Sequence, residues 1–233
     1  MRVDGLDERA VAPWRELLDA TERERAARFV FARNRVEFIA AHALARAALA
    51  LTFGVSPTEW DFVADAQGKP APLLGGKPAP LSFNLSHTTG MVGLAVVAGA
   101  NRALGFDLEK LDRELTMDIA DRYFTAQEVA WLYALPGAER SRGFLRLWTL
   151  KEAFIKATGK GLTDDLASFW FVPSPPRIHF LSYLGEDESA WGFEQRLIDG
   201  SFVAAVGLRH ASPFAVRWTA VDAAQLGPSG LAC

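Results

Sequence analysis

The chain has 233 residues, half of them apolar, with a formal net charge of −3, which is typical of a globular protein with a buried core. This mild acidity argues against a protein that binds duplex nucleic acid through a basic face, so we expect no nucleic-acid partner. The single cysteine, Cys233, excludes a disulfide framework, a cysteine-based zinc site and a credible thiol nucleophile.

The first residues are charged at Asp4, Asp7 and Glu8, where an export signal would be apolar, so we expect a cytoplasmic protein. The most apolar stretch, residues 38–53, is interrupted by His42 and Arg46 and is shorter than the roughly 20 apolar residues that span a bilayer. It predicts a core helix, and we expect no membrane partner.

In the first half, residues 22–53 have few helix breakers and predict one long helix or two shorter ones. Residues 67–80 are rich in Gly and Pro and predict a loop or an irregular edge. Apolar runs then predict a small sheet, with a polar turn at residues 86–90. Its three strands are expected at residues 81–85, 91–97 and 104–108.

The second half repeats this order, with helices first and strands afterwards. Residues 91–97 have a plausible counterpart in residues 202–208, which suggests a duplicated α+β unit. In that case residues 104–109 would lie at the junction, where ligand sites tend to form. Helices are predicted at residues 117–135 and 141–158, and strands near 169–172, 178–184, 191–198, 202–208 and 214–221.

Asp107 and Glu109 lie two residues apart in the predicted strand segment Gly105-Phe-Asp-Leu-Glu109. On a strand, both carboxylates project from the same face, whereas the residue between them points away. Two neighbouring carboxylates repel each other unless a cation lies between them, and oxygen ligands completed by water and phosphate suit Mg²⁺. Taken alone, the pair leaves open an exposed strand face with two solvated acids.

The segment Trp148-Thr-Leu-Lys-Glu-Ala-Phe-Ile-Lys156 predicts a helix that carries Glu152 and Lys156 on one face. Such a pair is ordinarily a surface ion pair worth about 0.3 to 0.5 kcal/mol. The following segment, Gly159-Lys-Gly-Leu162, ends the helix and lets backbone approach a ligand closely. Because of this glycine-rich segment, a functional role for Glu152 and Lys156 stays open.

Ser86 and His87 are expected just after the first predicted strand, in a turn where a hydroxyl and an imidazole would both be able to face an anion. A lone histidine in a turn is often incidental. A hydrolytic triad built on Ser86 has little support, because the chain has no Gly-x-Ser-x-Gly segment and no matching Asp/His arrangement.

Five short patterns follow one another along the chain. They are Gly-Lys-Pro at 68–70, Phe-Asn-x-Ser-His at 83–87, Gly-Phe-Asp-x-Glu at 105–109, Phe-Thr-x-x-Glu at 124–128 and Trp-Thr-x-Lys-Glu-Ala-Phe-x-Lys-x-x-Gly-x-Gly-Leu at 148–162. In this order and spacing, the chain resembles the Sfp-type 4′-phosphopantetheinyl transferases from about residue 28 to about residue 208. The run Phe29-Val-Phe-Ala-Arg33 is also similar to the broad-specificity members of that family.

The resemblance implies a role for each matching residue. Asp107 and Glu109 would hold Mg²⁺, and Glu152 would both contribute to the metal site and act as general base. Lys156 would contact the phosphate under attack. The phosphates of coenzyme A, chiefly the 3′-phosphate, would be held by Arg33, Lys69, Ser86 and His87.

The resemblance also implies a fold. Family members of this size are α+β pseudodimers, in which two similar halves each pack a helix on a small, mainly antiparallel sheet, with the active site at their junction. We therefore expect an N-terminal half at residues 1–105 with the coenzyme A nucleotide contacts. A C-terminal half at residues 106–233 would carry the metal and the catalytic residues, and such a chain can work as a monomer.

The implied reaction is Mg²⁺-dependent transfer of the 4′-phosphopantetheine moiety of coenzyme A to a serine of an apo acyl- or peptidyl-carrier protein, releasing 3′,5′-ADP. The alternatives are a coenzyme A-dependent acyltransferase, a coenzyme A diphosphohydrolase and a non-catalytic carrier-binding module. The sequence leaves open which carrier is served, where it docks, whether Mg²⁺ or Mn²⁺ is preferred and what Arg46 does. Lys77, in a second Gly-Lys-Pro triplet, lies outside the pattern and is interpreted as a loop charge.

Overall fold

The computed structural model describes residues 1–64, 68–112, 117–159, 166–182, 184–210 and 212–226, which form two compact units. Unit 1 contains Met1–Asn101 together with the segment that begins at Arg217, and unit 2 contains Arg102–Val216. Each unit combines helices with small antiparallel sheets, so the predicted α+β class is confirmed.

In unit 1 the helices precede the strands, apart from one short 3₁₀ helix near the C-terminus. The helical elements are α1 (Glu8–Val11), η1 (Ala12–Glu16), α2 (Ala20–Ala27), α3 (Ala32–Phe53), η2 (Pro57–Glu59) and η7 (Ala223–Leu226). The strands are β1 (Trp60–Ala64), β2 (Pro70–Leu74), β3 (Lys77–Pro78), β4 (Leu81–Thr88) and β5 (Met91–Ala98). They form one sheet of order β1-β2-β3 and one β4-β5 hairpin.

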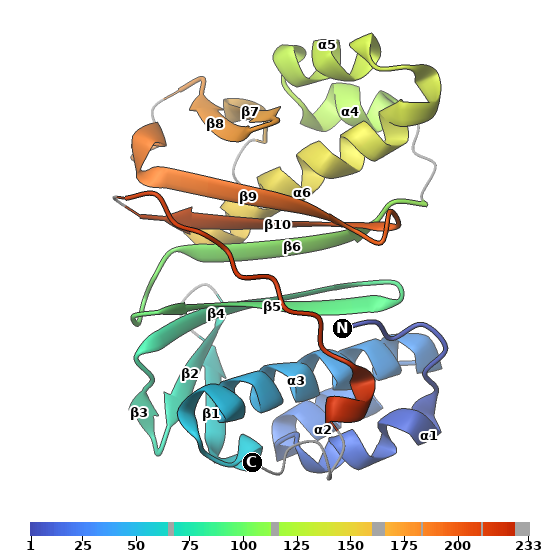
Figure 1. Ribbon diagram of the computed structural model, residues 1–233, viewed down its shortest axis with the longest axis vertical. Helices are drawn as coiled ribbons and strands as arrows, with labels where there is room; N and C mark the ends of the chain where they lie inside the picture. Colours follow the sequence, from blue (N-terminus) through green and yellow to red (C-terminus); the bar gives the residue numbers. More distant parts are fainter. Residues whose placement is uncertain (65–67, 113–116, 160–165, 183, 211, 227–233) are drawn as a thin grey trace. The chain divides into compact units, whose positions relative to one another are not determined.

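The long helix α3 is the core helix of unit 1, as the sequence predicts, and it packs along the β4-β5 hairpin (Figure 1). It ends at Gly54, whose positive φ of 65° lies in the left-handed region that glycine adopts without a Cβ penalty. Length and composition alone would also suit a membrane span, but 72% of its most apolar window is buried inside the protein. That burial is what a core helix requires.

The region 22–53 forms two helices rather than one, because Phe31 is extended and acts as the N-cap of α3. The loop predicted at residues 67–80 contains the short strands β2 and β3 in its described part. The polar turn predicted at residues 86–90 was placed too early, since β4 continues to Thr88. Ladder pairing with β5 outweighs the polar side chains there.

Unit 2 places its helices between its first strand and its remaining strands, apart from the short 3₁₀ helix η6, which lies between β8 and β9. The helical elements are α4 (Met117–Tyr123), α5 (Ala126–Ala134), η3 (Gly137–Glu139), α6 (Arg140–Thr158), η5 (Leu166–Ser168) and η6 (Glu188–Ala190). The strands are β6 (Leu104–Lys110), β7 (Phe169–Pro173), β8 (Pro176–Phe180), β9 (Trp191–Ile198) and β10 (Phe202–Arg209). They form a sheet of order β6-β10-β9 and a β7-β8 hairpin.

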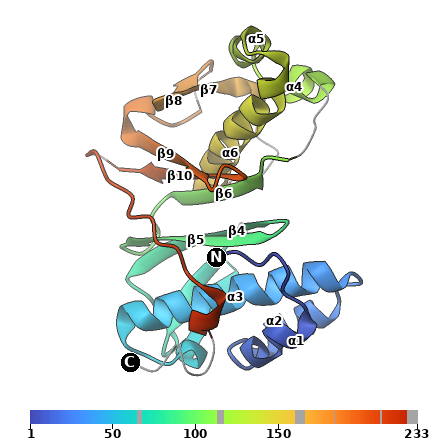
Figure 2. The same ribbon diagram turned by 45° about the vertical axis from the view of Figure 1, so that its right-hand side comes forward.

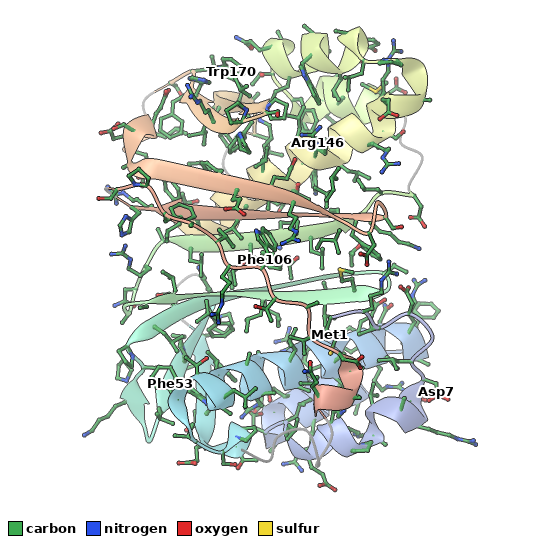
Figure 3. All side chains as sticks on the ribbon, viewed as in Figure 1. Met1, Asp7, Phe53, Phe106, Arg146 and Trp170 are labelled. Atoms are coloured by element: carbon green, nitrogen blue, oxygen red, sulfur yellow. The ribbon has the colours of Figure 1, made fainter. Side chains whose placement is uncertain are left out.

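The helix α6 packs on β6 and β10, as Figure 2 shows. Its apolar side chains, among them Leu147, Leu150 and Phe154, enter the core of unit 2. Arg146 of the same helix, labelled in Figure 3, is half-buried. Its Nε donates to Gln195 Oε1 of β9 at 3.0 Å. Apolar and polar contacts together therefore fix α6 on the sheet.

Three predictions for unit 2 need correction. The helix expected at residues 117–135 breaks before Thr125, which caps α5 and forms a capping box with Glu128. The strand expected at residues 178–184 is β8, which ends at Phe180. No strand forms at residues 214–221, where the Val216 amide donates to the Glu194 side chain instead of to a neighbouring strand.

Candidate active site

The strand β6 positions the two acids that the sequence singles out. It is an edge strand of its sheet, and its register pairs Asp107 with Ala205 and Glu109 with Val203 of β10. The two carboxylates therefore leave the same face of the strand. The side chain of Asp107 is only 7% exposed, whereas Glu109 is half-buried.

The helix α6 brings Glu152 and Lys156 against this strand. Lys156 Nζ donates to Asp107 Oδ1 at 2.7 Å, in a pair that is partly shielded from water. Glu152 is one helical turn earlier on the same face of α6. The structure thus unites two sequence patterns, one from β6 and one from α6, in a group of charges that we call the β6–α6 cluster: Asp107, Glu109, Glu152 and Lys156.

Gly105 explains why the strand and the helix come so close. A Cβ at this position would lie 1.8 Å from the carbonyl oxygen of Ala153 and 2.6 Å from the amide nitrogen of Ala157. Both atoms belong to the backbone of α6, so no side-chain rotation relieves the clash. The glycine in the Gly-Phe-Asp-x-Glu pattern is therefore needed for helix–strand packing, two residues before the acid that it helps to place.

The electrostatics of the cluster act mainly on Glu152. Burial is the largest cause that raises the pKa of Glu152 above its ordinary value of 4.5, and the negative charge of Asp107 is the second. The Lys156 ammonium lowers this pKa, and Glu109 adds a smaller increase. A carboxyl group whose proton affinity is raised in this way suits a general base better than an ordinary surface glutamate does.

The donors of the cluster fit a hard divalent cation. Its carboxylates are oxygen ligands, and Mg²⁺ in enzymes commonly uses one or two of them and completes its shell with water and substrate phosphates. Among the described residues, no three His, Cys, Asp or Glu side chains form a preassembled metal cluster. A site that takes its remaining ligands from water and substrate does not need one.

Four of the five predicted phosphate contacts lie in unit 1, on three segments. Arg33 is exposed in the first turn of α3, and Lys69 is half-buried immediately before β2. Ser86 and His87 lie within β4, opposite Gly93 and Val92, rather than in a turn. Neighbours on a strand point to opposite faces, and Ser86 is buried whereas His87 is exposed. The two side chains do not face one direction as a turn would allow.

Arg46, whose role the sequence leaves open, is a core residue of unit 1. Its side chain is 1% exposed and pairs with Asp19 at 2.7 Å and Glu22 at 2.8 Å. It also donates to the carbonyl oxygen of Trp60 at 2.7 Å and stacks over the ring of Phe62. These contacts join α2, α3 and β1, so Arg46 stabilises the unit and has no donor directed at a ligand.

A buried ion pair beside the cluster was missed from sequence. Lys151 and Glu128 are both fully buried, with Nζ and Oε2 2.9 Å apart. Lys151 also donates to the carbonyl oxygens of Leu166 and Phe169. The available signal was the capping box in Phe-Thr-x-x-Glu, which places Glu128 at the start of α5. The pair and these bonds anchor α6 to α5, η5 and β7.

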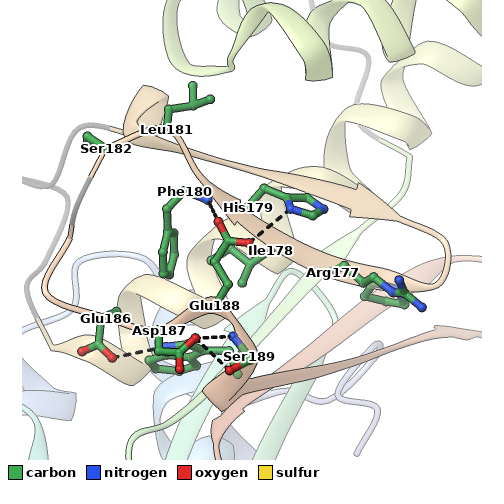
Figure 4. A pocket seen from close by; sticks show the side chains of 12 residues that line it. Arg177, Ile178, His179, Phe180, Leu181, Ser182, Glu186, Asp187, Glu188 and Ser189 are labelled. Carbon is green, nitrogen blue, oxygen red and sulfur yellow. Dashed lines mark hydrogen bonds and ion pairs between the residues drawn. The ribbon is translucent and has the colours of Figure 1, made fainter.

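The structure also has an open depression of about 950 Å³ that contains no predicted site residue. It is lined by β8 and the segment through η6, as Figure 4 shows. Its acids are bonded locally: Glu188 contacts His179 at 3.3 Å and Asp187 accepts from Ser189. Because these acids bond residues of the depression itself, we assign no ligand to it.

Lys160, Gly161 and Leu162 of the last pattern, like Cys233, lie outside the described residues. The described end of that pattern agrees with the prediction, because α6 ends at Gly159 with a positive φ of 71°. The described α6 pattern thus begins with core residues and ends with the two charged groups that face β6.

Two family profiles match the chain: "4′-phosphopantetheinyl transferase superfamily" over residues 103–207 and "4′-phosphopantetheinyl transferase, N-terminal" over residues 9–99. The chain is 32% identical to the 4′-phosphopantetheinyl transferase HetI of Nostoc sp., over 82% of this chain and 78% of that protein. A 4′-phosphopantetheinyl transferase of Bacillus subtilis is 33% identical over 65% of each chain. The transferase Sfp of Bacillus subtilis is 30% identical over 64% of this chain and 63% of its own length.

Proposed function

This chain belongs to the 4′-phosphopantetheinyl transferase superfamily, and from that premise we propose that it transfers phosphopantetheine from coenzyme A to a serine of an apo carrier protein, with a requirement for Mg²⁺. The products are the holo carrier and 3′,5′-ADP. The observation that carries the proposal is the contact between Lys156 and Asp107, which joins the two most specific sequence patterns in one site.

Glu152 is the general base of the proposed reaction. A serine hydroxyl is a poor nucleophile at neutral pH and needs a group that takes its proton during attack. The bond from the serine oxygen to phosphorus forms, the bond from phosphorus to the 3′,5′-ADP oxygen breaks, and the serine proton goes to the Glu152 carboxylate. The raised pKa of Glu152 supports this role, because proton transfer to it is more favourable than to an ordinary carboxylate.

Lys156 and the two acids of β6 serve the charge of the transferring group. Asp107 and Glu109, with Glu152, would hold Mg²⁺, which neutralises the charge that develops on the phosphate oxygens when it is bound. The Lys156 ammonium would contact the phosphate under attack. Its half-buried position supports this role, because a cation in a site with limited water stabilises phosphate charge more strongly than an exposed one does.

Arg33, Lys69, Ser86 and His87 would bind the phosphates of coenzyme A, chiefly the 3′-phosphate. Arg33 and His87 are both exposed, which supports this role. The burial of Ser86 makes its contribution the smaller one in our proposal. We do not include Arg46 among these contacts, because its guanidinium donates to Glu22 of α2 and to Trp60 of β1.

We further propose that the chain is a duplicated α+β unit that works as a cytoplasmic monomer. Each unit packs one long helix on an antiparallel pair of strands: α3 on β4 and β5, and α6 on β6 and β10. These strands have similar lengths, seven residues in β6 and eight in each of the others, which supports an ancestral repeat. Residues 1–105 would provide the nucleotide contacts, residues 106–233 the metal and catalytic groups, and the active site would lie at the junction.

The reaction is tested by incubating the protein with coenzyme A, Mg²⁺ and a panel of apo-carrier proteins, and then weighing the carriers by mass spectrometry. We expect one carrier to gain the phosphopantetheine mass at its serine only when coenzyme A and metal are both present. Turnover that survives exhaustive chelation would refute the metal requirement. Free phosphopantetheine formed without a carrier would identify a hydrolase, and transfer of an acyl group from a thioester would identify an acyltransferase.

Recognition of the 3′-phosphate is tested with dephospho-coenzyme A, which we expect to show a raised KM and a smaller change in kcat. Lys69→Ala and His87→Ala should weaken coenzyme A binding but leave dephospho-coenzyme A almost unaffected. Lys77→Ala is the matched control, because Lys77 is an exposed lysine in the second Gly-Lys-Pro triplet. Equal effects on both ligands would mean that these residues do not bind the 3′-phosphate.

A further inference from the structure

Lys156 and the metal proposed above would use the same carboxylate. Lys156 Nζ is 2.7 Å from Asp107 Oδ1, and the Asp107 side chain is 7% exposed while that of Lys156 is 29% exposed. Asp107 is also the most buried carboxylate of the β6–α6 cluster, so water screens its negative charge the least. Any metal ion that binds Asp107 therefore lies close to the Lys156 ammonium group that already contacts this carboxylate.

An ammonium and a dication on one buried carboxylate repel each other strongly, because little water and few mobile ions lie between them. Lys156 occupies only part of this carboxylate, which offers about four lone-pair sites on its two oxygens. The metal must therefore displace the ammonium or bind with the repulsion in place. Either alternative weakens metal binding to the protein alone.

The lysine has a way to leave Asp107. Its charge is at the end of a flexible four-carbon stem, and it sits in the last turn of α6, near the C-terminal end of the helix. In the proposed function its second partner is the diphosphate of coenzyme A. If Lys156 moves to that diphosphate, Asp107 can bind the metal, and the diphosphate becomes the new counter-ion of the ammonium.

We propose that Lys156 couples the two ligands: it competes with the metal for Asp107, and coenzyme A relieves this competition by binding the ammonium. This inference rests on the proposed function and adds an order to it, because metal binds tightly only when coenzyme A is present. Linkage makes the effect reciprocal, so metal tightens coenzyme A by the same factor. The device would keep the protein from holding a metal ion without its substrate.

The test is calorimetric titration of Mg²⁺ into the folded full-length protein without coenzyme A. Lys156→Gln removes the charge but keeps an N–H donor for Asp107, and Lys156→Met removes both. We expect both variants to bind Mg²⁺ roughly tenfold or more tightly than the wild type, as expected when a neighbouring like charge is removed from a partly buried site. A residue that only contacts phosphate would leave this affinity unchanged.

Lys110→Met is the matched control. Lys110 lies at the end of the same strand, is 28% exposed and pairs with Asp112 at 2.6 Å rather than with the cluster. Its loss removes the same net charge, so a general electrostatic effect would appear in both lysine variants. We expect Lys110→Met to change the Mg²⁺ affinity by less than about twofold, since Lys110 lies on the face of β6 opposite to Asp107 and Glu109 and its charge is balanced by Asp112. Equal tightening in both variants would overturn the proposal.

The same titration with saturating coenzyme A gives the coupling factor between the two ligands. Mg²⁺ also binds the diphosphate directly, so some coupling persists in every variant, and the difference between variants is the informative quantity. We expect a clearly larger coupling factor in the wild type and in Lys156→Arg, which keeps the charge, than in Lys156→Gln. Equal factors would overturn the proposal.

Asp107→Asn separates this inference from the proposed function. If Mg²⁺ binding survives Asp107→Asn, then the metal assignment is wrong and the inference is wrong with it. If Asp107→Asn abolishes binding and Lys156→Gln fails to tighten it, then only the coupling role of Lys156 is wrong. Thermal unfolding of each variant confirms that the titrated protein is folded, and either neutral variant suffices for the test if the other fails to fold.

Discussion

Gly105→Ala should damage both stability and activity, although it adds only one methyl group. The new Cβ would lie 1.8 Å from the carbonyl oxygen of Ala153, whereas ordinary contacts begin near 3.4 Å. Strand β6 and helix α6 must therefore separate locally by about 1.6 Å, the difference between these two distances. Overpacking of this kind costs about 1 to 3 kcal/mol, and we expect the upper end because both partners are backbone.

The same shift would stretch the 2.7 Å contact between Lys156 and Asp107. A displacement of about 1 Å in an active site can cost about 100-fold in rate, so we expect a comparable loss of carrier modification. Urea denaturation gives the stability change, and mass spectrometry of the carrier gives the rate. Gly137→Ala is the control, because nothing lies within 4 Å of its added Cβ. Near-normal stability and rate in Gly105→Ala would refute the close-approach argument.

Three further predictions concern buried charges. Glu128→Gln or Lys151→Met alone should lower the free energy of unfolding by about 3 to 5 kcal/mol, since each leaves a buried charge without its counter-ion, whereas replacing both residues by apolar ones should cost much less. Urea denaturation of the three variants tests this, and a double variant that loses the sum of the two single losses would contradict it. Glu152→Gln should raise the free energy of unfolding at pH 7, because the pKa of Glu152 is raised in the folded state, so that its contribution to stability is full only below about pH 4.5 and is lost as the pH rises through the folded-state pKa. Urea denaturation at several pH values tests this, and a difference in unfolding free energy between variant and wild type that stays the same on acidification would contradict it. Arg46→Met should lower the melting temperature without changing the KM for coenzyme A of the protein that remains folded, because its partners are Asp19 and Glu22; an increased KM would restore it as a ligand contact.

The parts of the fold that follow from local pattern were predictable. The core helix α3 shows its apolar residues in one run, and α6 ends at the glycine that the sequence identifies as its stop. The strand expected at residues 214–221 does not form, and its absence was not predictable in the same way. The alternating pattern of this segment suits a strand, but a strand also needs a neighbour, and the Val216 amide donates to a side chain instead.

The candidate site was predictable where chemistry and spacing agree. Asp107 and Glu109 share a face of β6 because strand geometry requires it, and the helix pattern places Glu152 and Lys156 one turn apart. The contact that joins these two pairs depends on Gly105, whose closeness to α6 cannot be read from spacing. The Lys151–Glu128 pair also stayed hidden, because a charged side chain in a helix pattern is expected at the surface and not at 0% exposure.

The most direct test of the proposed mechanism is the single-turnover rate of carrier modification by Glu152→Gln, at saturating coenzyme A and over a range of Mg²⁺ concentrations. Glu139→Gln is the control, because Glu139 precedes α6 and its side chain caps no backbone donor there. If Glu152 is the base, its loss should lower the rate by about 100-fold or more at every metal concentration, while the control keeps the wild-type rate. A Glu152→Gln protein that modifies its carrier at the wild-type rate would contradict the mechanism.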